Sequence, residues 1–413
     1  MRRSLGSPLL AAFVCLCLAA PQAHGGAIGI GPVPDGSKPA EALAPRIAEV
    51  MLDRIAGPLE HPWSIAFLPD GGILVTEKPG RLRLVHQGEL LPEPVAGVPE
   101  VLFAGHGGLL DVVLDPDHAS NGLLYFSYIH GTEEAAAVRI MRAQLEGMRL
   151  TGQEVIFESH PPVSGADQFG GRLAIGSDGL LYATMGDRFR GGPAQDLGDH
   201  AGSIVRIKRD GHAPEDNPFL GFPGALSEIF TIGHRNPQGL AFDPAGKRLW
   251  AVEHGPQGGD ELNVIRAGRN YGWPEITYGM DYDGTPIGIG VHAPGMEQPI
   301  HYWVPSVAPS GMTFYEGDLF PDWRGKLLVS TLSGQLLLLD LGEDAVIAQQ
   351  AVIEGSIGRI RDVRSGPDGF VYLVNDAPDG GLYRMGPAFD QAVYVREHTT
   401  ATDADVPVID PFH

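Results

Sequence analysis

The stretch IAFLPDGGILV, residues 65–75, decides the fold. Apolar residues fill the positions before Pro69-Asp70-Gly71, and a second apolar run rich in Ile, Leu and Val follows. Proline fixes φ and glycine accepts a positive φ, so this triplet makes a tight turn. Alternating or β-branched apolar runs favour strands. The stretch therefore predicts two antiparallel strands joined by a short turn.

The same strand–turn–strand pattern returns along the chain, with successive starts 47, 61, 67, 72 and 51 residues apart. Several strands per repeat and a mean period near 60 residues indicate the blades of a β-propeller. The 57 glycines and 35 prolines agree with many tight turns. The sequence predicts an all-β, six-bladed β-propeller. Its repeats start at Ile65, Val112, Leu173, Leu240, Met312 and Val363.

Residues 1–25 have the pattern of a secretory signal peptide. Arg2 and Arg3 precede an uncharged apolar run, residues 9–20, and small residues follow at Ala23 and Gly25. Twelve apolar residues are too short to span a bilayer. We expect cleavage near residue 25 and a periplasmic or secreted protein.

The rest of the chain divides into a linker at 26–49, the propeller domain at 50–388 and a polar tail at 389–413. We expect residues 50–52 to form a strand that completes the last blade. Residues 133–145 contain helix formers, but the repeat pattern predicts a strand there. Both cysteines leave with the signal peptide, so no disulfide or cysteine-bound metal is expected.

The net charge of −22 argues against a nucleic-acid partner, which needs a basic face. No stretch outside the leader approaches 18 consecutive apolar residues, so no membrane span is expected.

The loops between repeats contain four polar or aromatic motifs. GHRNPQG, residues 233–239, is either a structural turn network or part of a site. EHGPQGGDELN, residues 253–263, is either a plain glycine-rich loop or a source of backbone carbonyls for Ca²⁺. The aromatic side chains of NYGWP, residues 270–274, are expected to pack in the interior more often than to form a flat surface that binds a sugar. Arg359 and Arg361, two positions apart, share one side of a strand and either grip carboxylates or form surface ion pairs.

Together these loops resemble those of the soluble sugar dehydrogenases that depend on pyrroloquinoline quinone (PQQ), a family of glucose, aldose and sorbosone dehydrogenases. The resemblance is carried by residues 234–273, by LEHPWSIAF at 59–67 and by GGLLD at 107–111. It extends from about residue 50 to residue 386. The family fold is a six-bladed propeller, in agreement with the repeat count.

The resemblance implies PQQ and Ca²⁺ as cofactors, and a sugar and an electron acceptor as partners. It implies oxidation of a sugar at the anomeric carbon to a lactone, by hydride transfer to the quinone. The implied residue roles follow the family motifs. Arg235 and Asn236 contact the quinone oxygens, the carbonyls of Gly255 and Pro256 bind Ca²⁺, Arg359 and Arg361 hold the quinone carboxylates, Ser306 places a hydroxyl near the cofactor, and Asp187 orients the catalytic base.

Three positions depart from the family pattern. Gln168 stands where the family has its catalytic histidine, and an amide is no useful base. His106 stands where the family has a glutamine, and Ser333 where it has a lysine. We therefore hypothesise that His106 is the catalytic base, with Gln168 as its hydrogen-bonding partner at the cofactor site.

Two other functions remain open at this stage. Loss of the histidine at Gln168 is equally consistent with a propeller that binds a glycan or a protein without catalysis. A Ca²⁺-dependent lactonase is a weaker third possibility, because it needs carboxylate ligands converging in the channel.

Overall fold

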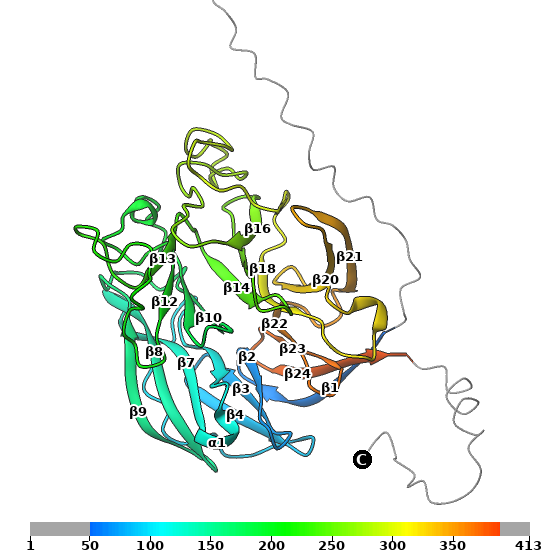
Figure 1. Ribbon diagram of the computed structural model, residues 1–413. Coiled ribbons are helices and arrows are strands. Elements are labelled where there is room, and N and C mark those ends of the chain that lie inside the picture. The colour runs from blue at the N-terminus through cyan, green and yellow to red at the C-terminus, as the bar shows by residue number, and fades with distance from the viewer. Residues whose placement is uncertain (1–49, 389–413) are drawn as a thin grey trace, which may run out of the picture. The chain divides into compact units, whose positions relative to one another are not determined.

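The six predicted repeats form six four-stranded antiparallel sheets arranged around a central axis (Figure 1). The structure is a computed structural model that describes residues 50–388. The first strand of each blade contacts the first strands of both neighbouring blades, so the ring is closed. The predicted all-β, six-bladed propeller is confirmed. The predicted signal peptide, linker and tail lie outside the described residues.

Blades one to three follow each other along the chain. Blade one contains β2 (Pro62–Phe67), β3 (Ile73–Glu77), β4 (Arg81–His86) and β5 (Glu89–Leu90). Blade two contains β6 (Leu109–Leu114), β7 (Leu123–Thr132), β8 (Ala135–Glu146) and β9 (Arg149–Glu158). Blade three contains β10 (Gly170–Ile175), β11 (Leu181–Met185), β12 (Ser203–Ile207) and β13 (Ile229–Ile232).

Blades four to six complete the ring. Blade four contains β14 (Pro237–Phe242), β15 (Leu249–Glu253), β16 (Asp260–Ile265) and β17 (His301–Trp303). Blade five contains β18 (Pro309–Phe314), β19 (Leu327–Thr331), β20 (Gln335–Leu341) and β21 (Val346–Glu354). Blade six contains β22 (Ile360–Ser365), β23 (Val371–Asn375), β24 (Gly380–Pro387) and β1 (Val50–Leu59).

The sixth blade joins the two ends of the described chain. Strand β1 pairs antiparallel with β24, with Val50 opposite Pro387, which confirms the predicted closing strand. The segment at residues 133–145, which contains helix formers, was predicted to be a strand, and β8 covers residues 135–146. The short helices are α1 (His118–Asn121), η1 (Gly192–Gln195) and η2 (Pro321–Trp323). Within residues 50–388, no helix is long and apolar enough to cross a membrane.

Turns between the first and second strands are fixed by their aspartates. The Asp70 carboxylate accepts the Gly72 main-chain N–H at 2.9 Å, and Gly71 adopts φ 87°. In three other blades the turn aspartate also accepts a hydroxyl from a tyrosine of the second strand, which ties the turn to the sheet. These pairs are Tyr125–Asp115 at 2.8 Å, Tyr182–Asp178 at 2.9 Å and Tyr372–Asp368 at 2.7 Å.

Two aspartates and two arginines fill the central channel. Arg172 is buried and bonds Asp362 at 3.0 Å, while Arg364 bonds Asp362 at 2.9 Å and Asp111 at 3.1 Å. The Trp63 ring stacks on the Arg172 guanidinium at 4.0 Å. Because the carboxylates are paired with arginines, they do not form the converging carboxylate ligands that a Ca²⁺-dependent lactonase needs.

One mouth of the channel collects the predicted site residues. They stand just before the first strands of their blades: His106 before β6, Gln168 before β10, Asn236 before β14 and Arg359 before β22. In an antiparallel hairpin the second strand ends where the first begins. Loops after β3, β11, β15 and β23 therefore open at the same mouth.

Candidate functional site

A cavity at this mouth encloses about 370 Å³, its open side included. Its lining comes from all six blades and combines rings, amides and guanidinium groups. The lining residues are Trp63, His106, Phe169, Gly170, Asn236, Gln238, His254, Leu332, Arg359 and Arg361. Four predicted site residues, His106, Asn236, Arg359 and Arg361, thus face one cavity.

Blade six supplies a cationic wall. Arg361 forms an ion pair with Asp376, which also bonds the His61 imidazole at 2.7 Å and lies 4.0 Å from Arg359. Although burial opposes ionisation, Arg361 holds the pKa of the Asp376 carboxyl well below its usual range. The Nε atom of Arg361 is buried and has no partner within residues 50–388. The wall therefore has hydrogen-bonding capacity left for an anionic ligand.

Lys78 adds a cation that the motif analysis missed. Its ammonium donates to the Gly105 carbonyl at 2.9 Å and lies 5.7 Å from the Phe103 ring. No carboxylate of the described chain lies within 4.0 Å of it, and burial lowers its pKa. The only sequence signal was a charged residue directly after the buried strand β3. Ser333, at the family lysine position, is exposed and bonds Thr331 instead.

Arg235 connects the predicted quinone and metal residues. Its Nη1 donates to the Gly255 carbonyl at 2.6 Å, and its Nη2 donates to the Tyr282 hydroxyl at 3.1 Å. The buried Glu253 carboxylate accepts the Arg235 main-chain N–H at 2.8 Å and the His234 ring at 2.9 Å. This carboxylate fixes the loop before β14, which includes Asn236.

Asp260 organises the loop that follows β15. It accepts hydrogen bonds from the Ser306 hydroxyl at 2.6 Å and from the main-chain N–H groups of Gly255, Val307 and Ala308. Ser306 therefore contacts this carboxylate and does not line the cavity. Burial raises the pKa of Asp260.

Gln168 fills the space between two predicted site residues. The hydrogen-bond network assigns its amide oxygen to Arg235, with Nη2 at 3.0 Å, and its amide nitrogen to Asp187. The side chain is 3% exposed. The amide thus acts as a fixed link between a guanidinium and a carboxylate.

His106 contacts Gln168 through the main chain and not through the amide. The Gln168 N–H donates to Nδ1 of His106 at 3.1 Å, so the neutral ring carries its proton on Nε2. Nε2 lies 3.5 Å from Asp167, and both side chains reach solvent. Partial desolvation at the mouth, together with the nearby cations, lowers the pKa of His106.

His254 is the second imidazole on the cavity. Its Nε2–H donates to the Pro309 carbonyl at 2.7 Å. Burial lowers its pKa to about 3, so the ring is neutral at physiological pH.

The cationic side chains at the mouth fit PQQ as they stand. The backbone carbonyls fit Ca²⁺ only if Arg235 moves. Lys78, Arg359 and Arg361 match an anionic ligand, and the orphaned Nε of Arg361 has no other use in the described chain. Carbonyl oxygens suit Ca²⁺, but Arg235 already caps the Gly255 carbonyl. No group of three or more His, Cys, Asp or Glu side chains between residues 50 and 388 is arranged to hold a metal. A cation at Gly255 therefore requires Arg235 to move.

The fold is a six-bladed propeller with a cationic mouth, and comparison with known proteins gives its family. The glucose/sorbosone dehydrogenase profile matches residues 59–384. The aldose sugar dehydrogenase YliI of Escherichia coli is 40% identical over 334 residues, covering 79% of this chain and 90% of that protein. Quinoprotein glucose dehydrogenase B of Acinetobacter calcoaceticus is 28% identical, covering 76% and 83%.

Solved structures give the same assignment. The apo-form aldose sugar dehydrogenase of E. coli superimposes with a TM-score of 0.79 at 39% identity, covering 82% of this chain and 99% of that one. The PQQ-bound aldose sugar dehydrogenase of Streptomyces coelicolor gives 0.67 at 30% identity, covering 82% and 98%. This chain belongs to the glucose/sorbosone dehydrogenase family.

Proposed function

We propose that this chain is an exported quinoprotein that oxidises an aldose at its anomeric carbon to the lactone. The observation that carries the proposal is the pair of cations Arg359 and Arg361, which share the Asp376 carboxylate and line one cavity with Asn236. The buried Lys78 ammonium lies close enough to Arg361 and Asp376 to interact with their charges. PQQ, when bound, would supply the hydride acceptor, and a separate acceptor would take up the two electrons. The carbonyls of Gly255 and Pro256 would hold Ca²⁺ as a Lewis acid once Arg235 has moved away from Gly255.

The cationic wall holds the cofactor carboxylates in this proposal. Arg359 and Arg361 offer planar donors, and Lys78 adds a point charge. Asn236 is fixed by the Gln238 amide at 3.1 Å and the Gly170 N–H at 3.3 Å, so its side chain is oriented before any ligand arrives. Such preorganisation lowers the cost of binding.

The proton of the anomeric hydroxyl passes to the His106–Asp167 pair. Nδ1 of His106 is engaged by the Gln168 N–H, so the pair accepts the proton at the Asp167 carboxylate, with the Nε2–H of His106 holding that carboxylate. This modifies the hypothesis drawn from the sequence, in which His106 itself is the base and Gln168 is its hydrogen-bonding partner. Asp187 is unsuited to the task because its oxygens already accept several N–H groups.

The test is a reconstitution of the mature protein. PQQ is titrated with and without Ca²⁺, followed by calorimetry and absorbance, and aldoses are then added with an artificial electron acceptor. We expect stoichiometric uptake and sugar-driven reduction. Absence of quinone uptake under both conditions would overturn the proposal and favour a glycan- or protein-binding propeller.

Two variants then test the proton acceptor. Asp167→Asn and His106→Ala should lower kcat by about 10²- to 10⁴-fold, the usual contribution of a positioned acid or base. Quinone affinity should stay unchanged in Asp167→Asn. Unchanged turnover in both loaded variants would exclude the pair.

A further inference from the structure

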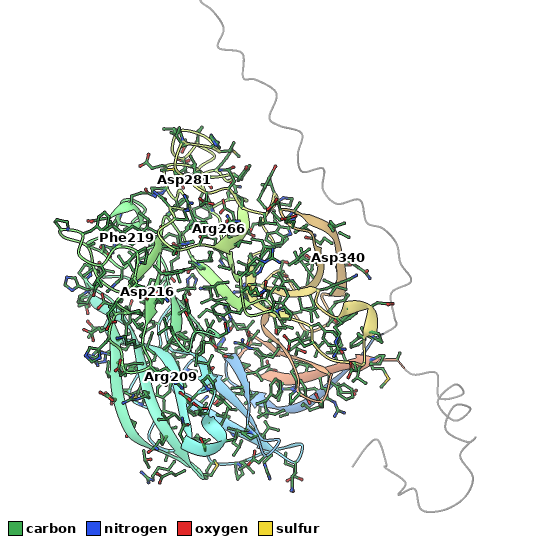
Figure 2. The ribbon with its side chains drawn as sticks, viewed as in Figure 1. Arg209, Asp216, Phe219, Arg266, Asp281 and Asp340 are labelled. Carbon is green, nitrogen blue, oxygen red and sulfur yellow. The ribbon has the colours of Figure 1, made fainter. Side chains whose placement is uncertain are left out.

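Three aromatic side chains surround the Arg235 guanidinium at the cavity mouth. The rings of Phe189 and Trp273 lie 5.7 and 5.3 Å from its central carbon, and Tyr282 accepts its Nη2–H. Phe189 follows β11, whereas Trp273 and Tyr282 belong to the long connection between β16 and β17. Figure 2 labels Asp281, the neighbour of Tyr282, on the part of this connection that projects from blade four.

These rings are unusually accessible for their size. Phe189 is 56% exposed and Tyr282 is 65% exposed. Trp273 is half-buried, whereas the four other tryptophans of the chain are buried. A gathering of exposed rings around polar donors marks a ligand-binding surface more often than a packing defect.

The backbone that presents Phe189 is strained. Arg188 and Phe189 have φ values of 58° and 56°, in the left-handed region that non-glycine residues rarely adopt. The Arg188 guanidinium compensates by donating to the carbonyls of Asp167 and Ala136 and stacking on Phe169 at 3.8 Å. The fold thus tolerates a strained backbone that keeps the apolar Phe189 ring exposed to solvent above the site.

Asp187 holds the aromatic groups in place. Its Oδ1 accepts the Phe189 N–H at 2.9 Å, and its Oδ2 accepts the Trp273 indole N–H at 2.7 Å. The same carboxylate accepts the amide nitrogen of Gln168. Burial raises the pKa of Asp187, while these donors favour its charged form. In this chain Asp187 therefore positions the Phe189 and Trp273 rings.

We propose that Phe189, Trp273 and Tyr282 form an aromatic clamp that binds the C–H face of a pyranose ring. Flat rings cover the apolar face of a sugar, and the Tyr282 hydroxyl beside Arg235 reaches its oxygens. The clamp comes from blades three and four, whereas the cations for the cofactor carboxylates come from blades one and six. The inference rests on the proposed sugar oxidation and names the groups that recognise the substrate.

The first test compares Phe189→Ala with Phe222→Ala. Phe222 is a matched control because it is 57% exposed and lies on the connection between β12 and β13. We expect Phe189→Ala to raise the KM for glucose about tenfold, which corresponds to loss of one stacking contact. Its kcat and PQQ affinity should stay within about twofold of the wild type, and Phe222→Ala should change nothing.

A second readout does not need the cofactor. Glucose added to PQQ-free protein should change the tryptophan emission, because Trp273 is the one tryptophan that is not buried, and Phe189→Ala should weaken that response. If the protein takes up no PQQ, the oxidation fails but this response still supports the clamp. The clamp is overturned if emission does not respond to glucose, or if Phe189→Ala weakens PQQ binding and leaves the glucose KM unchanged.

Discussion

Replacing Arg172 by methionine should destabilise the propeller by about 3 kcal/mol. Arg172 is 1% exposed and bonds Asp362 at 3.0 Å and the Gln238 carbonyl at 2.9 Å. Removing one partner of a buried ion pair costs about 3–5 kcal/mol, because the remaining charge loses its compensation. Arg364 still bonds both channel aspartates, so we expect the lower end of this range.

The assay is urea unfolding of the wild type and the variant, followed by fluorescence. The midpoint should fall while the slope stays constant, since the change in exposed surface is the same. Arg209→Met is the control, because Arg209 is 39% exposed and its ion pair with Asp115 should contribute no more than about 1 kcal/mol. A loss below about 1 kcal/mol for Arg172→Met would refute the idea that this channel network stabilises the ring.

Three further predictions concern the mouth. Lys78→Met should weaken PQQ binding about tenfold by calorimetry, the scale of one charge-assisted hydrogen bond, whereas Lys208→Met should not. Burial and a neighbouring carboxylate raise the pKa of Glu261 to about 8, so the native state binds an extra proton between about pH 4.5 and 8 and loses stability as pH rises through this window. Melting temperatures from pH 5 to 9 should show this loss in the wild type and not in Glu261→Gln. Arg235→Met should bind Ca²⁺ more tightly than the wild type when PQQ is absent, because it uncaps the Gly255 carbonyl, and calorimetry would show equal affinities if that cap is irrelevant.

The propeller was predictable because each blade repeats its own local signals. A proline, aspartate and glycine between apolar runs fix a turn without help from distant residues. The strand at residues 135–146 was also predictable, although its composition favours a helix, because the repeat pattern requires a strand there, and β8 pairs with β7 and β9 of its own blade. The packing of the 270–274 motif was predicted correctly for Tyr271, which stacks on His234 at 4.5 Å.

The sequence predicted which residues meet at the site, but not how their side chains are oriented. Sequence spacing brings Asn236, Arg359 and Arg361 to one mouth, but it does not say where side chains point. Ser306 turns to Asp260 because that carboxylate offers a nearby acceptor. Lys78 escaped notice because its proximity to blade six depends on the closure of the ring.

The exchange of histidine and glutamine changes what the neighbouring carboxylate does. The Gln168 amide nitrogen donates to Oδ1 of Asp187, the same oxygen that accepts the Phe189 N–H, while the amide oxygen accepts from Arg235. An imidazole at position 168 would donate to this carboxylate from a rigid ring of different shape, because it needs such a contact to fix its tautomer. The exchange would therefore shift Asp187 relative to the Phe189 N–H. The double variant His106→Gln/Gln168→His should therefore restore a base at position 168 but loosen Phe189, so the glucose KM should rise even where kcat is maintained. An unchanged KM would show that Asp187 does not couple the two tasks.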